Sequence, residues 1–217
     1  MTSTPERGLW LTDSAARANL GAFVERARRL DDAVVIRLCQ RSADALVAWA
    51  ATGFDVLASR VVKGTVRPAD ICADADALLR GLSAVDPSDS VDSGYVDPGF
   101  AMDSAWRGVL PPDSGFVHVD DVPASAVLAL ADRGAEVSKE QGSQGPPVSL
   151  LDQEVIHVSG SGVRVGIPMR CIFALTAMGF VGDLPEEVVR VRTVGVWLRI
   201  DARYGSVYRR RDLLRLV

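Results

Sequence analysis

The sequence has few of the side chains from which catalytic and metal sites are built. It contains two histidines and three widely separated cysteines, with no C-x-x-C pair. This spacing indicates neither a zinc site nor a disulfide framework, and small buried thiols are the simplest interpretation. The usual phosphate-loop, serine-hydrolase and zinc-protease signatures are also absent. We therefore predict a protein with no cofactor and no metal, and we favour a non-catalytic role.

Long apolar runs are scarce as well. The longest one, residues 45–51, has seven residues, whereas a membrane-spanning helix needs about 20. Residues 1–7 lack the apolar core of a secretory signal. These two features predict a cytoplasmic protein.

Lysine is almost missing, because Lys63 and Lys139 are the only two. The formal net charge of −4 argues against a wholly basic nucleic-acid binder. The charge is uneven, since residues 164–217 hold ten arginines and only five acidic residues. Arginine suits bidentate pairing with carboxylate or phosphate. The alternative is that a GC-rich genome simply encodes its basic residues as arginine.

The strongest structural signal lies at residues 188–211. Val196, Leu198 and Ile200 alternate with polar or bulky neighbours, the period of a half-buried strand. We predict a two- or three-stranded antiparallel meander with arginines on its open face. The Tyr204-Gly205 step predicts a tight turn with Gly205 at positive φ.

The first half of the chain predicts a strand at 9–11 and a helix from about 14 to 30, with three possible capping side chains at Thr12, Asp13 and Ser14. Its apolar stripe faces inward and its arginines face away. Strands at 33–38 and 45–51 and a helix at 75–82 capped by Asp74 follow. Residues 54–62 fit a strand or a short helix, and the spacing slightly favours the helix. The stripe comprises Ala16, Leu20, Phe23, Val24 and Ala27, and the outward arginines are Arg17, Arg26 and Arg28.

The second half repeats this rhythm. It predicts a strand at 116–119, a helix from Asp120-Asp121 to about Lys139, a hairpin around 159–162 and a helix at 168–178. The fold class is therefore α+β, with largely antiparallel sheets, packed helices and two similar β-α-β-β(-α) lobes ending in the basic meander. Duplication and a common way of building α+β layers explain the similarity equally well.

Between the halves the composition changes. Residues 85–124 contain eight aspartates and one basic residue. We predict an N-terminal lobe at 1–84, an acidic Asp/Ser/Pro/Gly-rich connector at 85–115 and a C-terminal lobe at 116–217. Residues 86–99 are expected to be mobile, whereas residues 106–109 should pack on a lobe.

The histidines are weak candidates for catalysis. His157 reads as a surface or packed strand residue, and an enzymatic role needs a base within reach of a nucleophile. His118 with Asp120 and Asp121 offers possible metal ligands, but the aspartates are better explained as helix caps. An enzyme with a site near His118 or His157 remains one alternative.

Our leading interpretation is a cytoplasmic binding or regulatory protein that recognises an anion through its C-terminal sheet. An acidic protein partner, or the acidic connector itself, is the favoured ligand, and nucleic acid is the alternative. No membrane contact is predicted. The candidate binding residues are Arg199, Arg203, Tyr204, Tyr208, Arg209, Arg210 and Arg211.

Overall fold

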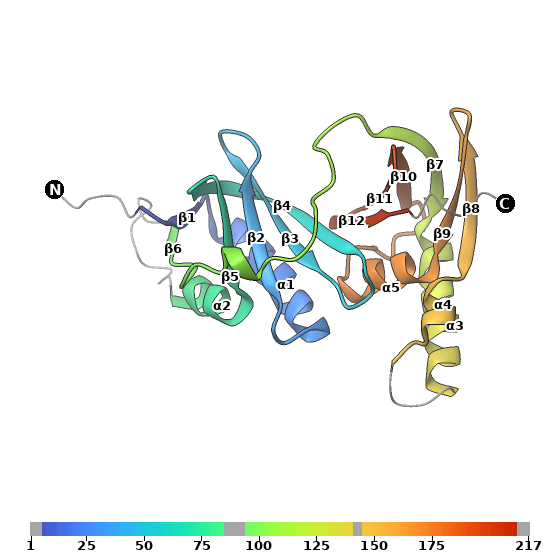
Figure 1. Cartoon of the computed structure of the whole chain (residues 1–217), viewed down its shortest axis with the longest axis horizontal. Helices are drawn as coiled ribbons and strands as arrows, with labels where there is room; N and C mark the ends of the chain where they lie inside the picture. Colours follow the sequence, from blue (N-terminus) through green and yellow to red (C-terminus); the bar gives the residue numbers. More distant parts are fainter. Residues whose placement is uncertain (1–5, 85–93, 141–144, 212–217) are drawn as a thin grey trace. The chain divides into compact units, whose positions relative to one another are not determined.

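A computed structural model describes residues 6–84, 94–140 and 145–211, which fall into two compact units. Unit 1 comprises Met1–Ala51 with Ser59–Val109, and unit 2 comprises Thr52–Ala58 with Leu110–Val217. Each unit combines antiparallel strands with helices packed on them (Figure 1). The predicted α+β fold class is therefore confirmed.

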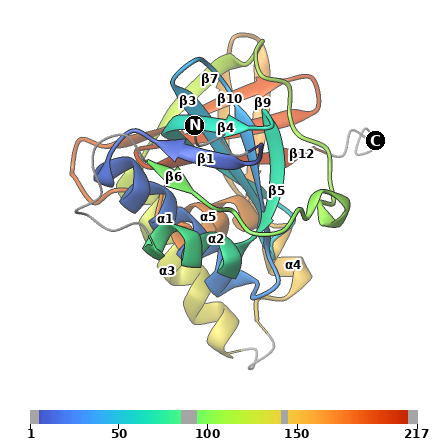
Figure 2. The ribbon, with the colours of Figure 1, turned by 90° about the vertical axis from the view of Figure 1, so that its left-hand side faces the viewer.

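Unit 1 is built on a sheet in the order β5-β2-β3-β4, to which β1 adds on β4 and β6 adds on β1. Helices α1 and α2 lie side by side against it (Figure 2). The elements are β1 (Gly8–Leu11), α1 (Ser14–Leu30), β2 (Val35–Gln40), β3 (Ala45–Ala51), β4 (Leu57–Arg67), β5 (Asp70–Asp74), α2 (Ala75–Ala84), β6 (Tyr95–Val96) and the 3-10 turn η1 (Asp103–Ala105).

Side-chain caps begin both helices of unit 1, as predicted. Asp13 accepts a hydrogen bond from the Ala16 amide at 2.6 Å, and Asp74 accepts one from the Ala77 amide at 2.8 Å. These bonds satisfy amides that have no partner inside the helix. The predicted apolar stripe of α1 is buried throughout, so its period-3.6 pattern fixes which face meets the sheet.

Residues 54–62 do not form the helix that their spacing favoured. Strand β4 begins at Leu57 and continues to Arg67, with β3 beside it and β1 on its second half. The spacing of apolar residues within 54–62 carries no information about these neighbouring strands. They supply inter-strand hydrogen bonds that a short helix would lack.

Unit 2 contains a four-stranded sheet in the order β12-β11-β10-β7 and a separate β8–β9 hairpin. Helix α5 packs on α3 and on β12. The elements are β7 (Val117–Pro123), α3 (Ala124–Glu140), α4 (Val148–Leu151), β8 (Glu154–Gly160), β9 (Val163–Pro168), α5 (Met169–Ala177), β10 (Val188–Val194), β11 (Trp197–Ala202) and β12 (Gly205–Arg210). The C-terminal meander thus has three strands.

Two details of unit 2 differ from the predictions. Gly205 is the first residue of β12, opposite Ala202, and it is not at positive φ; the left-handed glycine of the meander is Gly195, with φ 51°. Asp120 and Asp121 lie inside β7 rather than at a helix start, because pairing with β10 continues to Pro123. The capping interpretation of these aspartates is therefore wrong.

Part of the acidic connector packs on unit 1. Strand β6 pairs with β1, the Met102 amide donates to the Cys72 carbonyl, and the Arg37 guanidinium lies 5.7 Å from the Trp106 ring centroid. Val109, by contrast, is 67% exposed, so only part of 106–109 packs as expected. Most of the segment predicted to be mobile, 86–93, lies outside the described residues. None of the described helices is long and apolar enough to span a membrane.

Candidate functional site

The seven C-terminal candidate residues do not share one surface. Arg199 and Tyr208 are cross-strand partners on one face of the unit 2 sheet. Arg209 pairs with the buried Leu198, so it points to the opposite, covered face. Arg203 and Tyr204 form the turn between β11 and β12. The set therefore divides between two faces and a turn, as the period of two requires for neighbours on a strand.

Most of these arginines already have partners within unit 2. Arg199 donates to Asp201 at 2.6 Å and lies 5.5 Å from the ring centroids of both Phe116 and Tyr208. Asp201 also accepts from Arg192 at 2.9 Å. These contacts hold the Arg199 guanidinium in one orientation.

The remaining arginines of the set are engaged less tightly. Arg209 lies 3.6 Å from Asp152, Arg203 lies 3.8 Å from Glu187, and Arg211 donates to the Gly195 carbonyl at 2.6 Å. Arg210 is exposed. Internal pairing accounts for much of the basic meander.

Both histidines lie in exposed pairs with carboxylates. His118 Nε2 is 2.9 Å from Asp121 Oδ1. A bulge in β7, where His118 and Asp120 pair with the consecutive residues Arg192 and Val191 of β10, brings the His118 and Asp121 side chains to the same side. His157 Nε2 is 3.1 Å from Glu154 Oε2. Within the described ranges, no group of three or more His, Cys, Asp or Glu side chains is arranged to hold a metal ion.

The thiols lie in environments that suppress their reactivity. Cys72 and Cys171 are buried and Cys39 is half-buried. Burial raises the pKa of Cys39 and of Cys171 to about 12, and that of Cys72 to about 11. The thiolate is the nucleophile and the metal ligand, so these residues behave as structural side chains.

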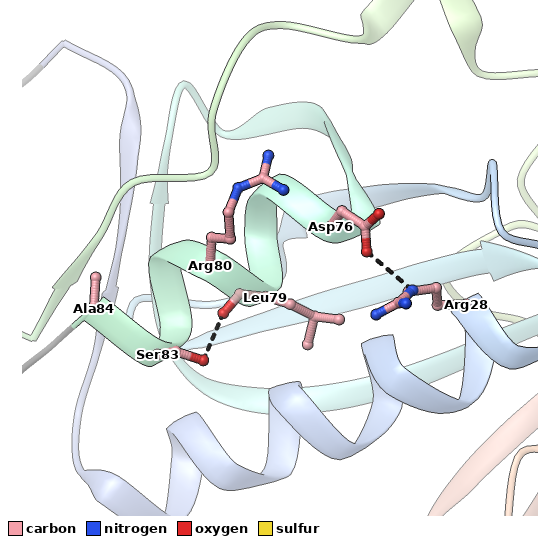
Figure 3. Close-up of a pocket in the computed structure, with 6 residues that line it drawn as sticks. All are labelled: Arg28, Asp76, Leu79, Arg80, Ser83 and Ala84. Atoms are coloured by element: carbon pink, nitrogen blue, oxygen red, sulfur yellow. Dashed lines mark hydrogen bonds and ion pairs between the residues drawn. The ribbon is translucent and has the colours of Figure 1, made fainter.

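A basic groove lies where α1 and α2 meet in unit 1, and the sequence reasoning did not identify it. Figure 3 shows Arg28 of α1 facing Asp76 of α2, with Nε 2.9 Å from Oδ1. Arg80 is exposed and its side chain points away from α1, whereas Ser83, whose hydroxyl donates to the Leu79 carbonyl, lies on the side of α2 that faces α1. Together with Ala84, these residues line a shallow hollow of about 410 Å³.

The groove continues along α1. Leu79 and Ser83 also line a second hollow of about 410 Å³, which reaches Arg17 and Gly21. Arg17 and Arg28 lie on the same side of α1, about three turns or 16 Å apart. The surface between them carries small side chains, Ala18, Gly21 and Ala22, together with the exposed Glu25. The full lining of this second hollow is Ser14, Arg17, Ala18, Gly21, Ala22, Glu25, Leu79, Leu82 and Ser83. We call the two hollows together the α1–α2 groove.

The two helices that form the α1–α2 groove carry more basic than acidic residues. Helix α1 carries four arginines and one glutamate, and α2 adds one arginine and one aspartate. Helix α3 of unit 2 carries two basic and three acidic residues. The outward arginines of α1 were the available sequence signal, but the docking of α2 beside them was needed to form a site.

Two family-level comparisons cover most of the chain. The family described as Domain of unknown function (DUF8010) matches residues 4–108, and Domain of unknown function (DUF8185) matches residues 111–214. The junction between them falls at the junction of the two units. No curated protein matches the sequence.

Solved structures give a consistent result. The DNA polymerase sliding clamp of Caulobacter crescentus aligns over 95% of this chain and 65% of its own, with 13% identity and a TM-score of 0.56. That of Bacillus subtilis aligns over 98% and 66%, with 10% identity and a TM-score of 0.58. The chain shares the fold of DNA polymerase sliding clamps.

A third sliding clamp also resembles this chain, but the clamp chains are longer. The beta subunit from the DNA polymerase of Streptococcus pyogenes aligns over 97% of this chain and 67% of its own, with 10% identity and a TM-score of 0.58. This chain therefore spans about two thirds of the length of the clamp chains it resembles. A two-unit, clamp-like α+β fold is compatible with a binding role that involves no catalysis.

Proposed function

We propose that this chain is a non-catalytic nucleic-acid-binding protein whose α1–α2 groove contacts the phosphate backbone. The observation that carries the proposal is the placement of Arg17, Arg28 and Arg80 around one groove, whose lining also includes Glu25 and Asp76. Arginine matches phosphate geometry through its fork of N–H donors. Backbone contacts of this kind supply affinity without requiring a catalytic group.

The pairing of Arg28 supports the same proposal. The Arg28–Asp76 contact joins side chains that are 50% and 47% exposed, and such surface pairs contribute only about 0–1 kcal/mol. A phosphate can therefore displace or share Arg28 at little cost. The fold adds support, because the solved structures that resemble this chain are named as DNA polymerase sliding clamps. We infer that this chain, too, acts in a process that handles DNA.

The test measures binding of a mixed-sequence DNA duplex across a range of salt concentrations. Arg28 and Arg80 line the groove, and Arg29 follows Arg28 at its edge on α1. All three side chains are exposed, so the triple variant Arg28→Gln/Arg29→Gln/Arg80→Gln should fold. Each phosphate contact contributes about 0.9 to the slope of log K against log salt. The triple variant should therefore bind more weakly and lower that slope by about 2–3.

A matched control removes the same charge from unit 2. The variant Arg133→Gln/Lys139→Gln/Arg164→Gln changes three exposed cations outside the groove. It should keep the wild-type affinity and slope. If both triple variants lose binding equally, net charge rather than the groove is responsible. If the wild-type protein binds no duplex at low salt, the proposal fails.

An acidic protein partner is a second candidate, on the sheet of unit 2. Among the described residues, Arg190, Arg192 and Arg199 form ion pairs there with two carboxylates, Asp121 and Asp201. Three guanidinium groups therefore share two carboxylates, and the Arg199 guanidinium is oriented by its contacts with Asp201 and the rings. This excess of positive charge supports recognition of a carboxylate-rich segment. Loss of binding to poly-glutamate in Arg190→Gln/Arg192→Gln, with duplex binding retained, would support this second role. Equal binding by the variant and the wild type would exclude it.

A further inference from the structure

A second group of aromatic and basic residues lies on the small strands of unit 1. Trp10 of β1 is the cross-strand partner of Tyr95 of β6, and their ring centroids are 5.5 Å apart. On the opposite edge of β1, the guanidinium carbon of Arg67, from β4, lies 5.5 Å from the Trp10 ring centroid. Figure 2 shows β1 between β4 and β6, so the three side chains form one continuous row.

A glycine makes room for the Tyr95 ring of the aromatic row. Gly8 pairs with Arg67 on β4, and the Tyr95 ring packs directly over it. A Cβ atom at Gly8 would collide with that ring. The Tyr95 hydroxyl also lies 3.4 Å from the Arg7 carbonyl. The rings are therefore held in position before any ligand arrives.

The row lies on the face of these strands that is opposite to the core. Leu9 and Val66 are buried. Trp10, Lys63 and Arg67 alternate with them and so point the other way. Lys63 and Arg67 are exposed. The Arg67 guanidinium makes a cation–π contact with Trp10. Neither Lys63 nor Arg67 forms a salt bridge with a carboxylate among the described residues.

We propose that this aromatic row binds single-stranded nucleic acid. Unpaired bases would stack on Trp10 and Tyr95, while Arg67 and Lys63 would take the adjacent phosphates. Lys63 and Arg67 are four residues apart on one strand, or about 13 Å, which lets them contact separate phosphates. Aromatic side chains next to a line of cations are the combination that sequence-tolerant single-strand binding uses.

The row is a separate site from the α1–α2 groove and has a different ligand. In a duplex, the bases stack on one another and their faces are covered, so Trp10 has nothing to stack on. A single strand offers those faces. We therefore expect the aromatic row to discriminate between the two forms of nucleic acid, whereas the groove contacts phosphates.

The experiment compares a labelled 12-nucleotide mixed-sequence single strand with the matching duplex, by fluorescence anisotropy at low and moderate salt. Trp10→Leu removes the stacking surface, and it should weaken single-strand binding by about tenfold or more with duplex binding unchanged. Trp10→Phe keeps an aromatic face and should retain most of the single-strand affinity. Thermal melting of both variants controls for folding.

A second variant avoids any change to the packed rings. Lys63→Gln/Arg67→Gln alters two exposed side chains and should lower the salt dependence of single-strand binding by about 1.4 in slope. The groove variant Arg28→Gln/Arg29→Gln/Arg80→Gln should behave in the reverse way, losing duplex and keeping the single strand. This opposite pattern makes the failure of either site distinguishable from the failure of the other.

Three results would overturn the single-strand assignment. One is the absence of single-strand binding by the wild type at low salt. Another is equal binding by folded Trp10→Leu and Trp10→Phe. The third is displacement of the bound oligonucleotide by poly-glutamate at equal charge concentration, since this would show that the row recognises negative charge alone, as an acidic peptide would supply.

Discussion

Replacing Arg170 tests how unit 2 is held together. This residue lies in the first turn of α5, and its side chain is only 9% exposed. Its Nη2 donates to Asp152 Oδ1 at 2.5 Å and its Nη1 donates to the Phe54 carbonyl at 2.7 Å. Arg170 therefore ties residues 52–58 to the helices of unit 2.

The expected loss in Arg170→Met can be worked from these contacts. Breaking a buried ion pair costs about 3–5 kcal/mol, and a buried carbonyl without its donor costs about 1–3 kcal/mol. Asp152, however, is 41% exposed and lies 3.6 Å from Arg209, so water and Arg209 can compensate for part of the loss. We expect the free energy of unfolding to fall by about 2–4 kcal/mol.

The measurement is urea unfolding followed by circular dichroism. Arg190→Met is the matched control, because Arg190 is 59% exposed and 3.9 Å from Asp121; it should lose less than about 1 kcal/mol. A double-mutant cycle with Asp152→Asn isolates the pairwise contribution. A loss below about 1 kcal/mol in Arg170→Met would refute the reasoning, since it would place the guanidinium in water rather than in a buried contact.

Three further variants are informative. Gly205→Val should destabilise unit 2 by about 1–3 kcal/mol, because even a Cβ there would meet the fully buried Phe180 ring at 2.6 Å; an unchanged melting temperature would contradict this. Gly195→Asn should cost less than about 1 kcal/mol in urea unfolding, since φ is 51° with open space around it and Asn tolerates the left-handed region. Hydrogen bonds from Arg37 lower the pKa of Asp70. The Arg37–Asp70 pair therefore stabilises the folded protein fully above the pKa of Asp70 in the unfolded chain, about 3.9, and this stabilisation is lost as the pH falls through the lower pKa of Asp70 in the folded protein. Asp70→Asn should be destabilised at pH 7 by about 0.5–1 kcal/mol. The difference from wild type should begin to decrease below about pH 4 and vanish once the pH is below the lowered pKa of Asp70 in the folded protein; a constant difference would exclude the pair.

Local signals in the sequence were sufficient for several elements. The Ser159–Gly162 segment predicted a hairpin, and Ser161 and Gly162 both adopt positive φ, at 51° and 76°, as a two-residue hairpin loop requires. The stripe on α1 and the alternation in the meander are likewise periodic patterns of one segment. Such patterns need no information about the rest of the chain.

Elements that depend on distant partners were missed. Residues 57–62 join a sheet because β3 lies beside them, and Asp121 belongs to a strand because Arg190 lies opposite. The α1–α2 groove needs α2 beside α1, and the Trp10–Tyr95 row joins residues that are far apart in sequence. No local spacing encodes these juxtapositions, so sequence reasoning could identify the arginines of α1 but not their site.

The C-terminal arginines show where period-two reasoning stops. It correctly separates Arg209 from Arg210, but it cannot tell which face of the strand is covered. Arg209 points to the covered side, and its partner Asp152 comes from the segment after α4. Charged side chains on a covered face require such partners, and Arg199 is held in a similar way by Asp201. A guanidinium group that already pairs with a carboxylate of its own unit binds an external anion less strongly, because the two anions compete for the same N–H donors. On the helices of unit 1, the Arg28–Asp76 pair joins two side chains that are each about half exposed, and this weaker pairing, rather than the number of arginines, favours the α1–α2 groove as the nucleic-acid contact.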